Sequence, residues 1–129
     1  MQAGAMPTWI VQKYVTANGK CPIDKWLSAL TAKDKIRLRT AVENMERVEK
    51  LPPRTIEKYK TTETFQMKVK GDNKQLRPFG VQTPGNKFVL LSGGIEKGGA
   101  IPQPDIDRAE RLRKEFENGK GSVKGYFED

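Results

Sequence analysis

The chain has 129 residues, and its 24 Lys and Arg against 16 Asp and Glu give a formal net charge of +8 at pH 7. Histidine is absent, which excludes Ser-His-Asp and Cys-His catalysis and every zinc site that contains histidine. The single cysteine, Cys21, excludes an internal disulfide. The length is typical of one domain, and the basic charge favours an anionic partner, most commonly nucleic acid.

The sequence also argues against a membrane protein. The mean hydropathy is −0.70, and no apolar run approaches the length of a membrane span. The first residues lack the basic-then-apolar order of a signal peptide. We therefore expect a cytoplasmic protein with no membrane partner.

The N-terminal part of the chain predicts a strand followed by a short helix. Residues 9–15 are rich in β-branched and aromatic side chains, which indicates a strand, and Asn18-Gly19 indicates a turn after it. Pro22 suits the first position of a helix, and apolar side chains recur at helical spacing over residues 23–30.

A second, longer helix follows at once. Thr31 and Asp34 resemble a capping box, in which the hydroxyl and the carboxylate satisfy free amides of the first turn. The apolar stripe then continues to about Glu49, and Pro52-Pro53 ends the helix. The minimal connection between the two helices predicts a helical hairpin.

The middle of the chain predicts three strands after a basic connector over residues 52–63. Residues 65–70 alternate with period two, which gives one apolar and one mostly basic face. Residues 76–82 form the next predicted strand, in which Pro78 indicates an edge, a bulge or an unpaired amide. Residues 88–91 are continuously apolar and indicate a central buried strand.

The C-terminal part predicts a glycine-rich loop over residues 93–99 and a last helix. Pro104 opens that helix, which ends near Glu117 before Asn118-Gly119. Residues 119–129 are predicted to be a flexible tail, which leaves one domain over residues 1–118. The order of elements predicts an α+β fold with a small, largely antiparallel sheet.

Four segments in this order carry a likeness to a known family. They are CPIDKWLSAL after the first strand, TAKDKIRLRTAVENMERV in the second helix, FQMKV with QLRPFGV in the paired strands, and VLLSGGIEKGGAIPQPDIDRAERLRKEF at the end. From about residue 9 to residue 116 the chain resembles the RelE/ParE toxin superfamily, and within it the phage-derived, HigB-related branch of type II toxin–antitoxin systems. It departs from that branch at Gln66, Lys68 and Pro78.

The resemblance implies a RelE-like fold and a metal-independent, cofactor-free endoribonuclease that cuts mRNA on the ribosome and is held by an antitoxin protein. In that reaction the ribose 2′-OH attacks the adjacent phosphate. The reaction needs a base for the 2′-OH proton, cations that offset charge on the phosphorane, and an acid for the leaving 5′-oxygen. Since RNA supplies its own nucleophile, histidine is not required.

Arg77 is the first candidate for both catalysis and RNA binding. Its fork can bind two phosphate oxygens at once, and its charge does not titrate away. The alternative interpretation is a surface ion pair with Glu63 or Asp72, because such pairs are common. The position of Arg77 in the strand pair that resembles the family favours the functional interpretation.

Lysines complete the predicted site. Lys68 and Lys97 join Arg77 as catalytic candidates, and Lys70 and Lys74 join it as RNA-binding candidates. A lysine packed near other cations gives up its proton more easily and can act as a base. The alternative is a solvated strand face that protects an edge for Lys68 and Lys70, and an exposed loop position for Lys97.

Other conspicuous side chains are interpreted as structural. The arginines of the last helix are expected to pair with its glutamates on a solvated face, although they extend the basic surface: Arg108, Arg111 and Arg113 with Glu110, Glu115 and Glu117. Trp9 and Trp26 are expected in the core. Tyr126 could stack on a base, but its place in the tail argues against it.

Two other functions are open at this point. The departures at Gln66 and Lys68 favour a non-catalytic, prophage-derived module that binds nucleic acid or protein with the same basic sheet. A gyrase-directed toxin of the ParE type is the other alternative, and it would act by protein contact without cutting mRNA.

Overall fold

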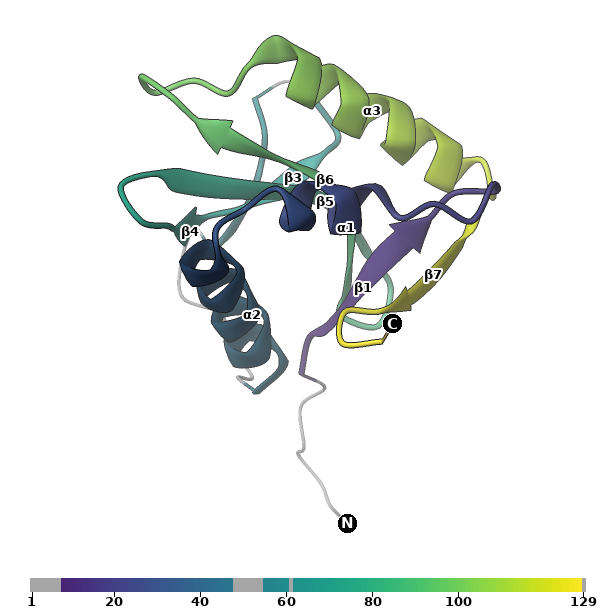
Figure 1. Ribbon diagram of the computed structural model, residues 1–129. Helices are drawn as coiled ribbons and strands as arrows, with labels where there is room; N and C mark the ends of the chain where they lie inside the picture. Colours follow the sequence, from purple (N-terminus) through teal and green to yellow (C-terminus); the bar gives the residue numbers. More distant parts are fainter. Residues whose placement is uncertain (1–7, 48–54, 61, 129) are drawn as a thin grey trace.

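The computed structural model describes residues 8–47, 55–60 and 62–128, and within them it has an α+β fold (Figure 1). The helices are α1 (Pro22–Ser28), α2 (Ala32–Arg47) and α3 (Gln103–Glu117). The strands are β1 (Ile10–Val15), β2 (Ile56–Lys58), β3 (Phe65–Met67), β4 (Val69–Lys70), β5 (Gln75–Thr83), β6 (Lys87–Glu96) and β7 (Ser122–Gly125). None of the helices in these ranges is long and apolar enough to cross a bilayer. The predicted fold class is confirmed.

The strands form one mixed sheet in the order β2-β3-β5-β6-β1-β7, and β4 pairs with β5 beside this path. β1 runs parallel to β6, and the other pairs are antiparallel. The run that was predicted as a central buried strand lies in β6, between β5 and β1. The long β5–β6 pair is therefore the centre of the sheet, and it carries Arg77 of the predicted site.

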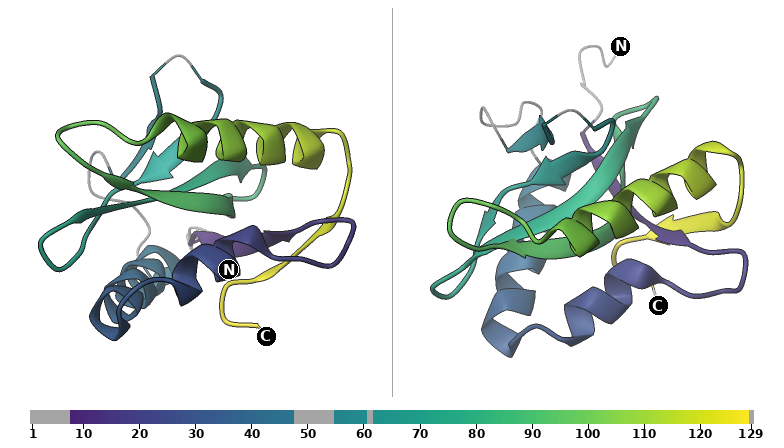
Figure 2. Two further views of the ribbon diagram at one scale, coloured as in Figure 1. Left: turned by 45° about the horizontal axis from the view of Figure 1, so that its top comes forward. Right: turned by 90° about the horizontal axis from the view of Figure 1, so that it is seen from above.

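Helices cover both faces of the sheet, with α1 and α2 on one side and α3 on the other (Figure 2). Alternating residues of β6 therefore enter different cores. On the side of α1 and α2 the packed side chains include Val11, Ile23, Leu38, Val42, Phe88 and Leu90. On the side of α3 they include Tyr14, Val81, Val89, Leu91 and Leu112.

A bulge interrupts the β5–β6 pairing just after Pro78. Phe79 pairs with Ser92 and Gly80 pairs with Leu90, so the register shifts by one residue at this point. A Cβ atom on Gly80 would lie 2.4 Å from the Val89 carbonyl oxygen, so the two strands approach closely only because residue 80 is glycine. The bulge is one of the outcomes that Pro78 indicated.

The predicted strand over residues 65–70 is divided in two. Lys68 lies between β3 and β4, and its amide donates a hydrogen bond to the Thr55 carbonyl at 3.1 Å instead of pairing with β5. Gln66, which was assigned to the basic face, is buried. The prediction of one continuous strand with a basic face is therefore wrong.

Two further segments differ from their predictions. The connector over residues 52–63 contains β2, which pairs with β3, and β6 continues through Gly93 and Gly94 to Glu96, where a loop was expected. The predicted helix end near Glu49 and the Pro52-Pro53 stop lie outside the described residues.

The tail that was predicted to be flexible instead forms β7. This strand pairs antiparallel with β1, and the Tyr126 amide donates to the Val11 carbonyl at 3.0 Å. The Tyr126 side chain is buried in the core that α1 and α2 cover. The buried Tyr126 ring and the pairing with β1 thus order a segment whose glycine-rich composition predicts no ordered structure.

Replacing Tyr126 with alanine is expected to release β7 from β1. Loss of the buried ring should raise amide hydrogen exchange in β7 by about tenfold, since local opening exposes those amides to solvent. The neighbouring Phe127 is 48% exposed, so Phe127→Ala is the matched control and should leave exchange nearly unchanged. Equal exchange rates in the two variants would show that the ring does not anchor the strand.

Asp34 ties the start of α2 to the turn between β4 and β5. The Thr31 hydroxyl oxygen accepts the Asp34 amide at 3.2 Å, which is the hydroxyl half of the predicted capping box. The buried Asp34 carboxylate accepts the Asp72 amide at 2.9 Å and lies 3.1 Å from Lys74 Nζ. The Asp72 amide, assisted by Lys74 and Thr31, holds the pKa of this carboxyl below its usual value against the opposing effect of burial.

Acid is expected to weaken this connection. Because the pKa of Asp34 is lower in the folded state than the ordinary value of about 3.9, its contribution is complete above that value and is lost as the pH falls through the folded-state pKa. Urea unfolding from neutral pH to about pH 2 should show a smaller acid-induced loss of stability in Asp34→Asn than in the unchanged chain. Parallel curves would contradict this role.

Candidate nucleic-acid interface

Arg77 lies near the centre of the sheet and is held in place by the chain itself. Its side chain is 7% exposed, and Nη2 lies 3.2 Å from the Glu96 Oε1 atom of the neighbouring strand. Nη1 donates to the Leu76 carbonyl at 2.9 Å, while Nε has no hydrogen-bond partner among the described residues. The ion pair that the sequence left open therefore exists, but its partner is Glu96 and not Glu63 or Asp72.

The strand register gathers several predicted cations at one end of the sheet. Lys70 pairs with Gln75, and Gln75 pairs with Glu96. Directly opposed residues point to the same face, and Arg77 shares that face because it lies two residues after Gln75. Lys97 follows Glu96 at the end of β6 and is exposed. Lys70 and Arg77 thus share one face of the sheet, and Lys97 follows the end of β6 at the same end of the sheet.

Two other predicted site lysines are bound to carboxylates. Lys68 Nζ lies 2.5 Å from Glu57 Oε1, and both side chains are partly exposed. Lys74 is paired with the buried Asp34, which places it on the side of α2. Lys68 therefore lies near β2 at the edge of the sheet. Lys74 stabilises the β4–β5 turn, and its ion pair with Asp34 does not bring it to Arg77.

Lys97 stands in a tight turn. Its amide donates to the Ala100 carbonyl at 2.7 Å, and the Ala100 amide donates back to the Lys97 carbonyl at 3.0 Å. Gly98 and Gly99 between them have positive φ values of 57° and 82°. This reciprocal pairing fixes the backbone from which the Lys97 side chain extends, and it also sets the direction in which the chain enters α3.

The carboxylates Glu57 and Glu96 were missed by sequence reasoning. Each is the partner of a predicted catalytic cation, so each sets the position and the local charge of the site. Glu96 could have been noticed because it directly precedes Lys97. That position points to a partner on β5 only when β6 is known to continue through Gly93 and Gly94. Glu57 carried no comparable signal, because β2 has only three residues.

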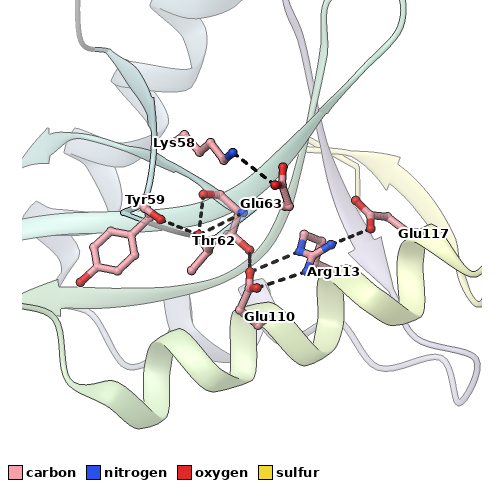
Figure 3. A network of polar contacts seen from close by, with 8 residues as sticks. Lys58, Tyr59, Thr62, Glu63, Glu110, Arg113 and Glu117 are labelled. Atoms are coloured by element: carbon pink, nitrogen blue, oxygen red, sulfur yellow. Dashed lines mark hydrogen bonds and ion pairs between the residues drawn. The ribbon is translucent and has the colours of Figure 1, made fainter.

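A network of polar contacts fastens the segment before β3 to α3 (Figure 3). Thr64 donates a short hydrogen bond to Glu110, which also pairs with Arg113 at 3.2 Å, and Arg113 lies 2.6 Å from Glu117. Burial opposes ionisation of Glu110, but the bonds from Arg113 and Thr64 outweigh it and lower the pKa of its carboxyl. This network joins the segment before β3 to α3, the helix that covers one face of the sheet.

The arginines of α3 form ion pairs within the helix as the sequence predicted, although Arg113 is buried and not solvated. Arg111 pairs with Glu115 at 3.4 Å, and Arg113 pairs with two glutamates of its own helix. Arg108 pairs with Asp105 at 2.9 Å instead of a glutamate. These contacts are intrahelical, so they stabilise α3 without requiring a partner molecule.

Comparison with known proteins assigns the chain to a family. No curated protein matches the chain. Residues 25–114 match the family described as "Phage derived protein Gp49-like (DUF891)". The matched segment includes β5 and β6 with Arg77 and Lys97, and it stops before β7. The match spans well over half of the sequence, and the chain therefore belongs to the phage-derived Gp49-like family, which is RelE-like.

Proposed function

We propose that this protein is the toxin of a type II toxin–antitoxin system from the HigB-related branch, and that it cuts mRNA on the ribosome without a metal. The observation that carries the proposal is the collection of Lys70, Arg77 and Lys97 at one end of the sheet in a RelE-like family member. Cations at one end of the sheet suit the charge that builds on a phosphorane.

In the proposed reaction the 2′-OH oxygen forms a bond to the adjacent phosphorus, and the bond from phosphorus to the 5′-oxygen breaks. Lys68, once released from its ion pair with Glu57, is assigned as the base that takes the 2′-OH proton, and Lys97 supplies a proton to the leaving 5′-oxygen. Arg77 binds the non-bridging oxygens with its fork. The products are a 2′,3′-cyclic phosphate and a 5′-hydroxyl end, so atoms and protons balance.

The two carboxylates have a role in this scheme. Glu57 and Glu96 hold Lys68 and Arg77 at positions that a substrate phosphate would otherwise have to organise. When RNA arrives, its phosphate replaces the Glu96 carboxylate as the partner of Arg77. Pre-positioned cations cost little reorganisation during the reaction, which is the condition under which charge stabilisation is most effective.

Expression of the chain under a tight promoter tests the proposal. Growth should stop, and mapped mRNA should carry new 5′-hydroxyl ends within translated regions. The antitoxin is sought as a short adjacent reading frame that encodes a helix-turn-helix protein. Its co-expression should restore growth. A harmless wild-type chain that leaves ribosome-bound mRNA intact would refute the proposal.

A non-catalytic binding module is the second candidate. It is favoured by one observation, namely that Arg77 and Lys68 are both neutralised by carboxylates in the unbound protein. Such a module would bind RNA with an affinity that falls steeply as salt rises, because phosphate contacts release counterions. Salt-dependent binding without any cleavage would select this candidate over the toxin.

A further inference from the structure

A cationic cleft lies away from the site around Arg77. Beyond the end of β1, α1 and α3 flank β6 on opposite sides (Figure 2) and enclose a cavity of about 610 Å³. This is within the usual range of small-molecule sites, about 300–1,000 Å³. Arg77 and the four lysines of the predicted site do not line it. The cleft is therefore a separate feature of the surface.

The floor of the cleft carries a buried hydroxyl. Ser92 lines the cavity and is 2% exposed, and its Oγ has no hydrogen-bond partner among the described residues. Ser92 stands at the β-bulge, where it follows Leu91, a residue that packs with Leu112 of α3. A buried polar group without a partner is costly, so a ligand that bonds to this hydroxyl would recover that free energy.

One wall of the cleft is an aromatic ring fixed by a glycine. A Cβ atom on Gly93 would lie 2.3–2.4 Å from three ring atoms of Trp26, so the indole rests on bare backbone of β6. Trp26 is half-buried and lines the cavity. Trp26 was expected in the core, but its ring is only partly buried there. The rest of the ring is available to a flat ligand in the cleft.

The rim of the cleft is strongly basic. Lys20 and Lys25 lie on the side of α1, and Arg108 and Arg111 lie on the side of α3. Among the described lining residues Glu115 is acidic and is paired with Arg111, and Arg108 is paired with Asp105, which does not line the cleft. The two lysines are exposed. The rim therefore keeps a net positive charge, which suits a phosphate group.

We propose that this cleft binds a nucleoside monophosphate unit, with its base against Trp26 and its phosphate between Lys25 and Arg108. A basic rim, an aromatic wall and a buried hydroxyl together match a ligand that combines a phosphate with a flat, hydrogen-bonding ring. The unit is either a free nucleotide or one residue of an RNA strand, and only the second source rests on the proposed function.

Tryptophan fluorescence tests the site directly. In a Trp9→Phe background, Trp26 is the remaining tryptophan and reports on the cleft. AMP and UMP are the probes, and adenosine and inorganic phosphate are the partial ligands. We expect saturable quenching by at least one nucleotide, with the partial ligands at least about tenfold weaker. No saturable quenching by either nucleotide would overturn the proposal, and so would inorganic phosphate binding as tightly as the nucleotides.

Matched charge variants locate the binding. Lys25→Gln with Arg108→Gln removes two charges from the rim and should raise the dissociation constant by about tenfold or more. Lys33→Gln with Arg37→Gln removes two charges from the exposed side of α2 and should leave it unchanged. Ser92→Ala should weaken binding without changing the charge. Equal effects of the two charge pairs would reduce the interaction to unspecific attraction and refute the site.

Cys21 gives a second readout in the unmodified chain. It is the single cysteine, it lines the cleft, and burial raises the pKa of its thiol, so alkylation is best followed at mildly alkaline pH. AMP or UMP should slow this alkylation, and inorganic phosphate should slow it less. Unchanged alkylation at saturating nucleotide would contradict the site even if Trp9→Phe failed to fold.

An RNA arm identifies the source of the nucleotide. If a single-stranded RNA displaces AMP, the cleft takes a residue of an RNA strand, and if it binds without displacing AMP, the cleft takes a free nucleotide. Arg77→Ala should not change AMP binding. If the chain cleaves mRNA but does not bind AMP or UMP, this inference alone is refuted. If the chain binds a nucleotide but is harmless to cells, only the proposed function is refuted.

Discussion

Replacement of Arg77 with alanine is expected to lower the rate of mRNA cleavage by about 100- to 1,000-fold, which is the usual cost of removing one preorganised donor from a developing negative charge. Growth arrest should disappear with it. The reason is that the guanidinium is buried near the centre of the sheet and keeps two strong donors at a fixed place, with Glu96 on one side and the Leu76 carbonyl on the other.

The buried position of Arg77 requires a control for folding. Arg77→Lys keeps a charge but loses the fork, so it should recover stability and only part of the activity. Arg37→Ala removes an exposed arginine of α2 and should cleave at the wild-type rate. Single-turnover cleavage of ribosome-bound mRNA, with thermal unfolding of each variant, is the measurement. A folded Arg77→Ala protein that cuts within about tenfold of the wild-type rate would exclude Arg77 from the reaction.

Replacement of Gly80 with alanine is expected to lower the free energy of unfolding by about 3 kcal/mol or more, at the upper end of overpacking effects. The new methyl would stand 2.4 Å from the Val89 carbonyl oxygen and 3.0 Å from the Phe88 ring. Neither neighbour can yield easily, because one is backbone of the central strand and the other is a buried ring. The β5–β6 pair would have to separate at its bulge.

Gly125 supplies a matched glycine-to-alanine control for this experiment. A Cβ atom there would meet Glu128 at 3.4 Å or more, which is ordinary contact with a flexible side chain. Gly125→Ala should therefore change stability by less than about 0.5 kcal/mol. Urea unfolding of both variants compares them on one scale. Similar losses would mean that the cost comes from glycine replacement in a strand and not from the close approach.

The long elements could be predicted because their signals are local. Pro22 and Pro104 lie at or close to the helix starts, and the apolar run in β6 is long enough to identify a central strand. β2 and β7 have three and four residues, and neither contains a repeating apolar pattern. Such short strands exist because a neighbour offers free backbone groups, and that information is not in their own residues.

The candidate site was predictable in its cations but not in their partners. Arg77 and Lys97 could be placed from segments that resemble the family, whereas the pairing of Arg77 with Glu96 depends on strand register. That register includes a bulge and continues through Gly93 and Gly94, residues whose composition favours a loop. Cross-strand partners follow from three-dimensional pairing, so sequence reasoning found the charges and missed what neutralises them.

The strand β7 also bears on self-association. Without it, β1 would be the outer strand of the sheet, and its amides and carbonyls would be open to a second molecule. The Tyr126 amide and its neighbours occupy that edge from within the same chain. β7 thus replaces the six-residue edge of β1 by a four-residue edge, and a shorter edge strand offers less backbone for edge-to-edge pairing with a second molecule.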